Sequence, residues 1–392
     1  MSVTLLFPSF DHPAIEERYG SWQNRLLLRA SQPGAPVRDY DASHTLQDPA
    51  TTIESDFVLV VTDPIFVPSP RLIDLLVTAL DDHPSAFAVV PLANESENKH
   101  QRRSPAQPYL TLRQFEETAE TIAQEPALRF EIEWDESDPA VFLCRTRDLQ
   151  TRERLAPGAL AGETVVVVTN AYIHRFSSHR GQLRGDLLER IHPEVTSMLE
   201  FGCGEASLGA ALKARQPCRV VGIELDPEAA VVARSRIDEV LSGDVRELIG
   251  AIDERFDYIV GGDILEHLDD PWTFLRELRR VANPGAHLLL SIPNIASWPI
   301  VADLLRGRFD YVYMGITCAG HLRFFTRRTI EEMLEIAGWG VASITPQESF
   351  ITPEYLALEQ RLDGSGIAWS REDLITPGYY VIAVNGLVPG DP

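Results

Sequence analysis

Short apolar runs alternate with segments of helical periodicity throughout this chain of 392 residues. Runs that are apolar at nearly every position predict buried strands, and stretches with apolar residues three or four apart predict helices. In the first half, the predicted strands cover residues 3–8, 57–61, 86–92, 139–145 and 165–176, and the predicted helices cover residues 11–30 and 68–80. Strands and helices in this alternation indicate an α/β fold.

The second half repeats the pattern with its own set of elements. Its predicted strands cover residues 197–200, 219–226, 239–242, 287–294, 338–344 and 378–384, with a further strand beginning at 256, and its helices cover 183–191, 208–214 and 328–337. The chain is too long for a single domain of this kind. We therefore expect two α/β domains, at residues 1–178 and 179–392.

The turn after the strand at 197–200 carries the clearest chemical signal. Glu200 ends an apolar run, and Gly202 and Gly204 follow it, with Ser207 where a dinucleotide fold would place its third glycine. Glycines let the backbone turn tightly and approach a ligand. A pyrophosphate bound at the following helix would be repelled by Glu200. The turn instead suits a nucleotide that carries an ammonium and a sulfonium.

From about residue 181 to residue 385 the chain resembles the class I S-adenosylmethionine-dependent methyltransferases, which have a seven-stranded Rossmann-like sheet. Three later motifs support the resemblance, at Glu224, at Gly243-Asp244 and at Asp263. An acid about 20 residues past the glycine turn suits two ribose hydroxyls, and the resemblance implies that Asp244 receives the adenine amino group. The expected cofactor is S-adenosylmethionine, held by Glu200, Gly202, Cys203, Gly204, Glu224, Leu225, Asp244, Val245, Asp263 and Ile264.

Simpler roles stay open for several of these residues. Glu224 precedes Asp226-Pro227, which predicts a helix N-cap followed by proline in the first turn. Gly243-Asp244 is common turn chemistry. Cys203 suits a small buried filler better than a nucleophile.

Methyl transfer requires alignment of the acceptor, exclusion of water and often removal of a proton. The candidate bases are His267, after the fourth strand, and His321, in a Gly-His-Leu-Arg-Phe-Phe-Thr stretch that resembles a motif of small-molecule methyltransferases. Either histidine could instead have a purely structural role. The long aromatic segment 295–318 predicts a lid over an acceptor pocket, or an apolar insertion packed on the sheet. We expect Arg323, Trp298 and Tyr313 to contact the acceptor.

The N-terminal half weakly resembles the GT-A glycosyltransferases, through the strand at 57–61 with its acidic turn, the strand at 139–145 and the ending of the strand at 165–176. Such enzymes hold a divalent metal with an Asp-x-Asp pair, but this strand has only Asp63 at its end. The Asp39-Tyr40-Asp41 sequence follows no apolar strand. We therefore expect no metal, except at Asp63 if this domain is active, and favour a degenerate domain. The polar segment 94–103 predicts a mobile loop.

Charge and cysteine content limit the class of protein. A formal net charge of −23 disfavours nucleic acid and other acidic partners. The four cysteines are scattered, which fits a reducing cytoplasm without disulfides or a thiolate zinc site. No leader pattern and no long apolar run is evident, so a cytoplasmic protein without a transmembrane segment is expected.

The leading hypothesis is an enzyme that transfers a methyl group from S-adenosylmethionine to an oxygen, less readily a nitrogen, of a small molecule or glycan. One alternative is a bifunctional glycosyltransferase/methyltransferase. Another is a non-catalytic scaffold that keeps the cofactor fold. A nicotinamide dehydrogenase is disfavoured by Glu200 and Ser207.

Overall fold

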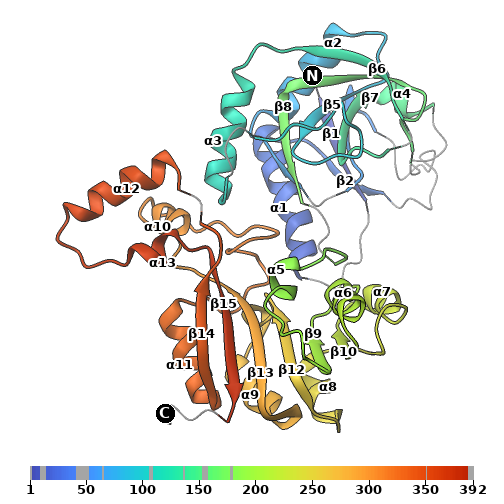
Figure 1. Ribbon diagram of the computed structural model, residues 1–392. Coiled ribbons are helices and arrows are strands. Elements are labelled where there is room, and N and C mark those ends of the chain that lie inside the picture. The colour runs from blue at the N-terminus through green and yellow to red at the C-terminus, as the bar shows by residue number, and fades with distance from the viewer. Residues whose placement is uncertain are drawn as a thin grey trace. The chain divides into compact units, whose positions relative to one another are not determined.

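The computed structural model describes residues 2–8, 15–40, 53–63, 66–105, 109–135, 137–151, 158–176, 180–349 and 351–386. The chain divides into two compact units (Figure 1). The first contains residues 1–177 and 310–320, and the second contains residues 178–309 and 321–392. The expected domain boundary at residue 178 lies outside the described residues.

The N-terminal unit is built on an eight-stranded mixed sheet. Its strand order is β2 (Val37–Tyr40), β1 (Val3–Pro8), β3 (Phe57–Val61), β7 (Val141–Arg145), β5 (Ala88–Ala93), β8 (Thr164–Arg175) and β4 (Phe66–Pro68), and β6 (Arg129–Glu133) pairs with β8. Helices α1 (Ile15–Ser31) and α2 (Leu72–Asp82) contribute to the core on one face. Helices α3 (Leu112–Ala123) and α4 (Thr146–Leu149) contribute to the core on the other.

Two polar segments of this unit have defined places in the structure. Asp39 lies within the short strand β2, which pairs in parallel with β1 at the edge of the sheet. The polar segment 94–103 has exposed residues such as Glu95 and Lys99, but its Ser96, Asn98 and Gln101 are buried and hydrogen-bonded. The Gln101 side-chain amide donates to the carbonyl of Pro91 at 2.9 Å. Short polar side chains here satisfy buried backbone groups that would otherwise need water.

The C-terminal unit confirms the seven-stranded Rossmann-like sheet. The strand order is β11 (Glu239–Ser242), β10 (Arg219–Glu224), β9 (Ser197–Phe201), β12 (Phe256–Gly262), β13 (Ala282–Pro293), β15 (Gly378–Asn385) and β14 (Trp339–Pro346). The first five strands are parallel, and β15 runs antiparallel to both of its neighbours. The carboxyl ends of β9, β10, β11 and β12 therefore meet at one edge of the sheet.

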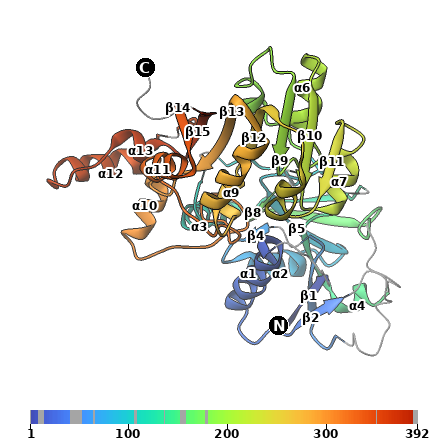
Figure 2. The same ribbon diagram turned by 90° about the horizontal axis from the view of Figure 1, so that it is seen from below.

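Helices cover both faces of this sheet. Successive residues of β9 point to opposite sides, so Met198 and Leu199 belong to different cores. The Met198 side is covered by α5 (Gly185–Leu188), α6 (Ser207–Arg215) and α7 (Pro227–Ala233). The Leu199 side is covered by α8 (Val245–Leu248), α9 (Pro271–Leu278) and α11 (Arg327–Ala337). Figure 2 shows α7 beside β10 and β11.

Capping hydrogen bonds fix the starts of two of these helices, and the sequence predicts the first of them. The Asp226 carboxylate accepts from the backbone N–H groups of Glu228 and Ala229 at the start of α7. Thr326 caps α11 through a reciprocal capping box with Thr329.

A small helical group carries a core of its own, beyond the sheet. Helices α10 (Trp298–Leu304), α12 (Pro353–Asp363) and α13 (Arg371–Ile375) gather together in Figure 1. Their shared core is formed by Trp298, Ala302, Tyr355 and Leu374. The segment 295–318 is thus not a single loop, because it begins with α10, and its last part, from residue 310, belongs to the N-terminal unit. None of the described helices is long and apolar enough to cross a membrane.

Candidate active site

The glycine turn after β9 requires glycine for steric reasons within the protein itself. Gly202 and Gly204 have φ angles of 69° and 55°, in the left-handed region that side chains disfavour. A Cβ on Gly202 would collide with the side chain of Ile264, and one on Gly204 would lie 2.5 Å from the carbonyl oxygen of Arg180. Cys203 between them is buried, which raises the pKa of its thiol. The thiol therefore stays protonated.

Glu200 places a carboxyl group at the end of β9 with incomplete hydrogen bonding. Its side chain is 7 % exposed, and its Oε2 atom has no hydrogen-bond partner. Burial raises its pKa to about 8, the charge of Glu224 acts in the same direction, and a backbone hydrogen bond from Gly209 opposes them. A buried carboxylate without a full set of partners is costly. The position therefore favours a cationic ligand that would donate hydrogen bonds to Glu200.

Glu224 is held at the end of β10 by two backbone donors. The N–H of Gly204 donates to its Oε2 at 2.7 Å, and the N–H of Asp226 donates to its Oε1 at 2.8 Å. These bonds connect the glycine turn to the helix start at Asp226. Each carboxylate oxygen keeps further acceptor capacity, which two hydroxyls could use. The next residue, Leu225, is 69 % exposed, so its side chain offers apolar surface beside Glu224.

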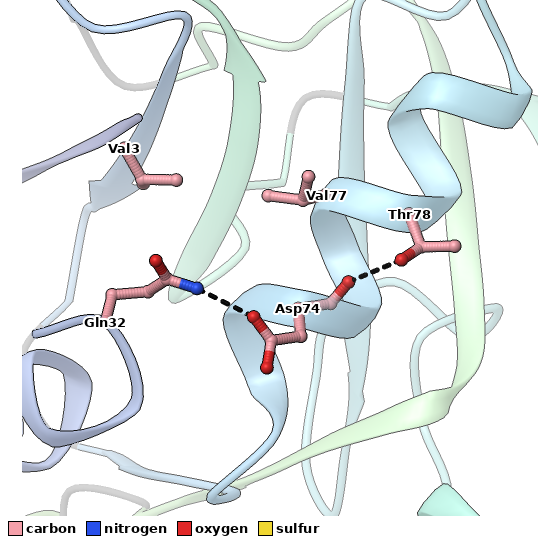
Figure 3. Close-up of a pocket in the computed structure, with 5 residues that line it drawn as sticks. All are labelled: Val3, Gln32, Asp74, Val77 and Thr78. Carbon is pink, nitrogen blue, oxygen red and sulfur yellow. Dashed lines mark hydrogen bonds between the residues drawn. The ribbon is translucent and has the colours of Figure 1, made fainter. Parts of the chain in front are cut away.

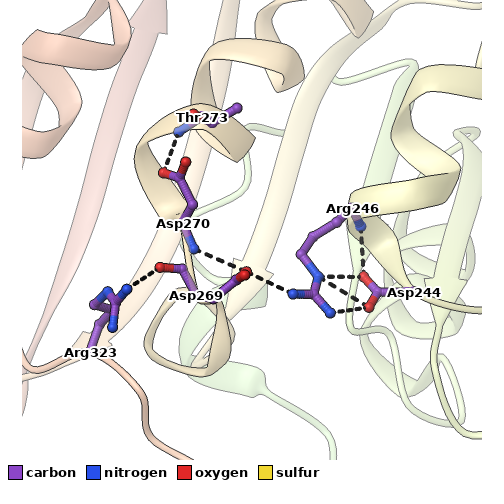
Figure 4. A network of polar contacts seen from close by, with 6 residues as sticks. All are labelled: Asp244, Arg246, Asp269, Asp270, Thr273 and Arg323. Atoms are coloured by element: carbon purple, nitrogen blue, oxygen red, sulfur yellow. Dashed lines mark hydrogen bonds and ion pairs between the residues drawn. The ribbon is translucent and has the colours of Figure 1, made fainter.

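Asp244 belongs to a network of charged groups at the same edge of the sheet (Figure 4). It caps α8, and the guanidinium of Arg246 donates to both of its oxygens, which lowers the pKa of Asp244. Arg246 also donates to Asp269 at 2.7 Å, and Arg323 donates to the carbonyl oxygen of Asp269. The network thus connects the segment after β11 to the segments after β12 and after residue 320.

Asp263 follows β12 in a left-handed backbone conformation, with φ of 54°. Its carboxylate accepts from Arg184 Nη1 at 2.7 Å. Arg184 also donates to Asp186 and to the hydroxyl of Ser291. A Cβ on Gly262 would lie 2.9 Å from Arg184 Nη1, so this glycine provides room for the guanidinium. Arg184 therefore joins the segment before β9 to the carboxyl ends of β12 and β13.

Comparison with known proteins shows what this part of the chain is similar to. Residues 172–344 match the family model described as a methyltransferase domain. A probable S-adenosylmethionine-dependent methyltransferase of Mycolicibacterium smegmatis is 30% identical over 193 residues, which are 49% of this chain and 65% of that protein.

Other relatives cover shorter parts of the methyltransferase domain. A ubiquinone biosynthesis O-methyltransferase of Azorhizobium caulinodans is 34% identical over 155 residues, which are 38% of this chain and 60% of that protein. The chain thus spans less than two thirds of the length of these relatives. A solved structure of a methyltransferase from Archaeoglobus fulgidus is 17% identical, with a TM-score of 0.36 over 49% of this chain and 87% of that chain.

Both candidate bases lie together in the C-terminal unit, beside a third group that the sequence did not suggest. His267 ends the single turn η3 (Leu265–His267), and His321 opens the stretch that leads to α11. Their rings meet edge to face, with centroids 4.8 Å apart. Glu266 lies beside them, with its Oε1 atom 3.9 Å from His321 Nε2. The structure thus brings together three titratable side chains from two segments 54 residues apart in the chain.

Glu266 is the residue that reasoning from the sequence missed. Its side chain is fully buried, and neither carboxylate oxygen has a hydrogen-bond partner. Burial raises the pKa of this carboxyl well above its usual value, and the charge of Asp263 adds to the effect. The available signal was an acid set between Leu265 and His267 in an otherwise apolar stretch.

The residues expected to contact the acceptor have different surroundings. Trp298 is buried in the core of the α10–α12–α13 group, with its ring 6.1 Å from that of Tyr355. Tyr313 belongs to the N-terminal unit, where its ring centroid lies 5.3 Å from that of Phe176. Arg323 is held by Asp269, close in sequence to the histidines. Of the three, Arg323 belongs to the polar network that also contains Asp244 and Asp269.

The N-terminal unit offers less for chemistry among its described residues. Asp63, after β3, forms an ion pair with Arg175 of β8 at 3.1 Å. A small pocket on the same unit is lined by Val3, Gln32, Asp74, Val77 and Thr78, and in it Gln32 donates to Asp74 at 2.7 Å (Figure 3). That pocket places one carboxylate beside apolar side chains and has no convergent set of polar groups.

Proposed function

We propose that this protein transfers a methyl group from S-adenosylmethionine to a hydroxyl oxygen of a small molecule or carbohydrate. The observation that carries the proposal is the buried Glu200 carboxyl with an unpartnered oxygen, at the edge where Glu224 and the glycine turn also lie. A cofactor with an ammonium, a sulfonium and two ribose hydroxyls supplies the donor and the positive charge that the Glu200 carboxyl lacks. The names of the relatives, several of them O-methyltransferases, support the same reaction.

The cofactor residues take separate roles in this proposal. Glu200 accepts from the ammonium of the methionine part, and Glu224 accepts from the ribose hydroxyls. The exposed side chain of Leu225 packs on the adenine, whose amino group donates to Asp244. Gly202, Cys203 and Gly204 form the turn beneath the cofactor, and Val245, Asp263 and Ile264 complete its surroundings.

The chemical step needs little from the protein beyond position and a proton acceptor. The acceptor oxygen uses a lone pair to form the new C–O bond, while the S–CH3 bond breaks and its electron pair returns to sulfur. The hydroxyl proton leaves to a base, for which His321 and His267 are the candidates. The products are S-adenosylhomocysteine, the methyl ether and one proton. Arg323 lies on the acceptor side of the same edge.

Calorimetry with S-adenosylhomocysteine tests the cofactor assignment. The wild-type protein should bind it, and Glu200→Gln and Glu224→Gln should each weaken binding by roughly 10- to 100-fold, because each loses a charge-assisted hydrogen bond. Glu194→Gln is the matched control, since Glu194 is an exposed acid of the same unit. Absence of binding by the wild-type protein would remove the proposal. If the wild-type protein binds the nucleotide, incubation with labelled S-adenosylmethionine and an extract of cellular metabolites would identify the acceptor as the compound that gains the labelled methyl group.

A carbohydrate acceptor is favoured by the GT-A-like character that we propose for residues 1–178, with the methyltransferase domain at residues 179–392. The ion pair between Asp63 and Arg175 supports the view that this domain is degenerate, since a guanidinium already neutralises the carboxylate where a metal would be needed. Manganese with any nucleotide sugar should leave the melting temperature unchanged. A clear upward shift would favour the bifunctional alternative instead.

A further inference from the structure

Apart from the strand ends that carry Glu200 and Glu224, the described residues of the C-terminal unit include one carboxyl group that lacks hydrogen bonds at both oxygens. This group is the side chain of Glu266. It is fully buried, without a hydrogen bond to either oxygen. In contrast, the partly exposed Asp186 and Asp263 of the same unit both have the guanidinium of Arg184 as a partner. A buried carboxyl without partners destabilises the folded protein, and a cation bound beside it offsets part of that cost. His267 and His321 lie near enough to share such a cation with Glu266.

We propose that Glu266, His267 and His321 bind a divalent transition-metal cation, with Zn²⁺ as the ion whose ligand preference they match. One ligand atom from each side chain lies within 4.8 Å of the others. Two imidazoles and one carboxylate form a ligand set of catalytic zinc sites, which keep the fourth position open. Mg²⁺ and Ca²⁺ prefer oxygen ligands throughout, so they fit this set less well.

The distances are compatible with a site that closes on the metal. Ligands at about 2.1 Å from a tetrahedral zinc ion lie about 3.4 Å apart. The Glu266–His321 separation of 3.9 Å therefore needs to shorten by about half an ångström. The other separations, all within 4.8 Å, also need to shorten for the three side chains to share one ion.

The backbone already holds the two segments together. The N–H groups of Leu322 and Arg323 donate to the carbonyl oxygen of Glu266 at 2.7 Å and 3.0 Å. Arg323 donates in turn to the carbonyl oxygen of Asp269. The ligands thus belong to a preorganised pair of segments within one unit, so that metal binding would require little additional ordering.

The open position of the metal gives the site a role in the proposed reaction, and this part of the inference rests on the proposed function. A hydroxyl bound to Zn²⁺ loses its proton far more readily than a free one. The metal would therefore hold the acceptor oxygen and favour its ionised form before it attacks the methyl group, with the hydroxyl proton passing to solvent water. As ligands, His267 and His321 would position the metal instead of accepting that proton. Such a metal would select acceptors whose hydroxyl group can reach it beside His321.

Titration of the metal-free protein with Zn²⁺, followed by calorimetry, tests the metal site without any acceptor. We expect one Zn²⁺ per chain and a higher melting temperature. Glu266→Gln, His267→Ala and His321→Ala should each weaken binding by roughly 100-fold or more, since loss of an outer partner alone costs about 10- to 100-fold. His192→Ala is the matched control, because His192 is an exposed histidine of the same unit. Its binding should equal that of the wild type.

S-adenosylhomocysteine affinity, measured on every variant, separates folding and cofactor failure from metal failure. A variant that binds the nucleotide but not Zn²⁺ supports the site. Wild-type protein that binds the nucleotide but no Zn²⁺, or variants that all keep Zn²⁺, would overturn the metal inference and leave the proposed function intact. If a variant fails to fold, the visible spectrum of the wild-type protein loaded with Co²⁺ tests the site instead, and a spectrum of tetrahedral Co²⁺ would support it. A spectrum of octahedral, water-ligated Co²⁺ would count against the site.

Discussion

Glu200→Gln should make the cofactor-free protein more stable while weakening its binding of S-adenosylhomocysteine. The amide has nearly the same shape as the carboxyl group, and its oxygen can still accept the backbone hydrogen bond from Gly209. The substitution therefore removes only the free-energy cost of ionising the Glu200 carboxyl, which is 7 % exposed. Opposite effects on stability and on affinity are typical of a residue retained for its ligand.

The magnitude follows from the pKa of Glu200. Its carboxyl has a pKa of about 8 in the folded protein, against the ordinary value of 4.5 that applies in the unfolded chain. Because the folded pKa is the higher one, the carboxyl costs nothing below pH 4.5, and stability is lost as the pH rises toward 8. Relative to Glu200→Gln, the wild-type protein should be less stable by about 1 kcal/mol at pH 5.5, about 3 at pH 7 and about 4 at pH 8.

Denaturant unfolding at these three pH values measures the difference. The transition of the C-terminal unit is the one that S-adenosylhomocysteine shifts, which identifies it in a protein of two units. Both proteins are then compared without the nucleotide. A stability difference that stays constant from pH 5.5 to pH 8 would refute the reasoning, since it would show that Glu200 does not titrate in this range.

Three further changes have expected outcomes. Gly261→Ala would place a methyl group against the fully buried ring of Phe201, so we expect a loss of about 1–3 kcal/mol in unfolding free energy, and an unchanged melting temperature would contradict the packing. Asn294→Ala would leave buried carbonyl groups near α13 unpaired, which should cost about 1–3 kcal/mol, with nucleotide affinity measured as the control that should not change. Asp244→Asn weakens an ion pair with the half-exposed Arg246, so stability should fall by less than about 1 kcal/mol. Its nucleotide affinity should fall roughly 10-fold, and calorimetry showing equal affinity would argue against adenine recognition by Asp244.

The sheet of the C-terminal unit could be predicted because each buried parallel strand is a nearly continuous apolar run. Val220 and Val221 face opposite cores, so both positions must be apolar. The acids at the strand ends interrupt these runs, which marks both the end of the strand and the candidate cofactor residue. Local signals of this kind were enough for Glu200, Glu224 and Asp263.

Elements whose local signals were weak or were passed over were missed. Strand β6 is a polar partner of β8 with mostly exposed or half-exposed residues, so its sequence lacks an apolar run. Helix α10 begins at Trp298-Pro299, and proline in the first turn was a signal of a helix start within the segment interpreted as a loop. The assignment of residues 310–320 to the N-terminal unit depends on contacts between distant parts of the chain.

The polar groupings of the site also depend on contacts far apart in sequence. Arg184 meets Asp263 across 79 positions, and Glu266 meets His321 across 55. A single sequence gives the residue types at such positions but not their pairing. The candidate histidines were therefore named individually, and the carboxyl group that joins them became evident only in the structure.

The charge around Arg184 argues for a cationic cofactor over a dinucleotide. Its guanidinium already serves Asp186 and Asp263 through hydrogen bonds, and its charge also acts on Glu200. A diphosphate would bring further negative charge to this edge and would compete with these carboxylates for one cation. An ammonium and a sulfonium instead supply the positive charge that Glu200 needs in order to ionise. In the role that we propose for Glu200, the carboxyl group that is costly in the free protein would become favourable once the cofactor is bound.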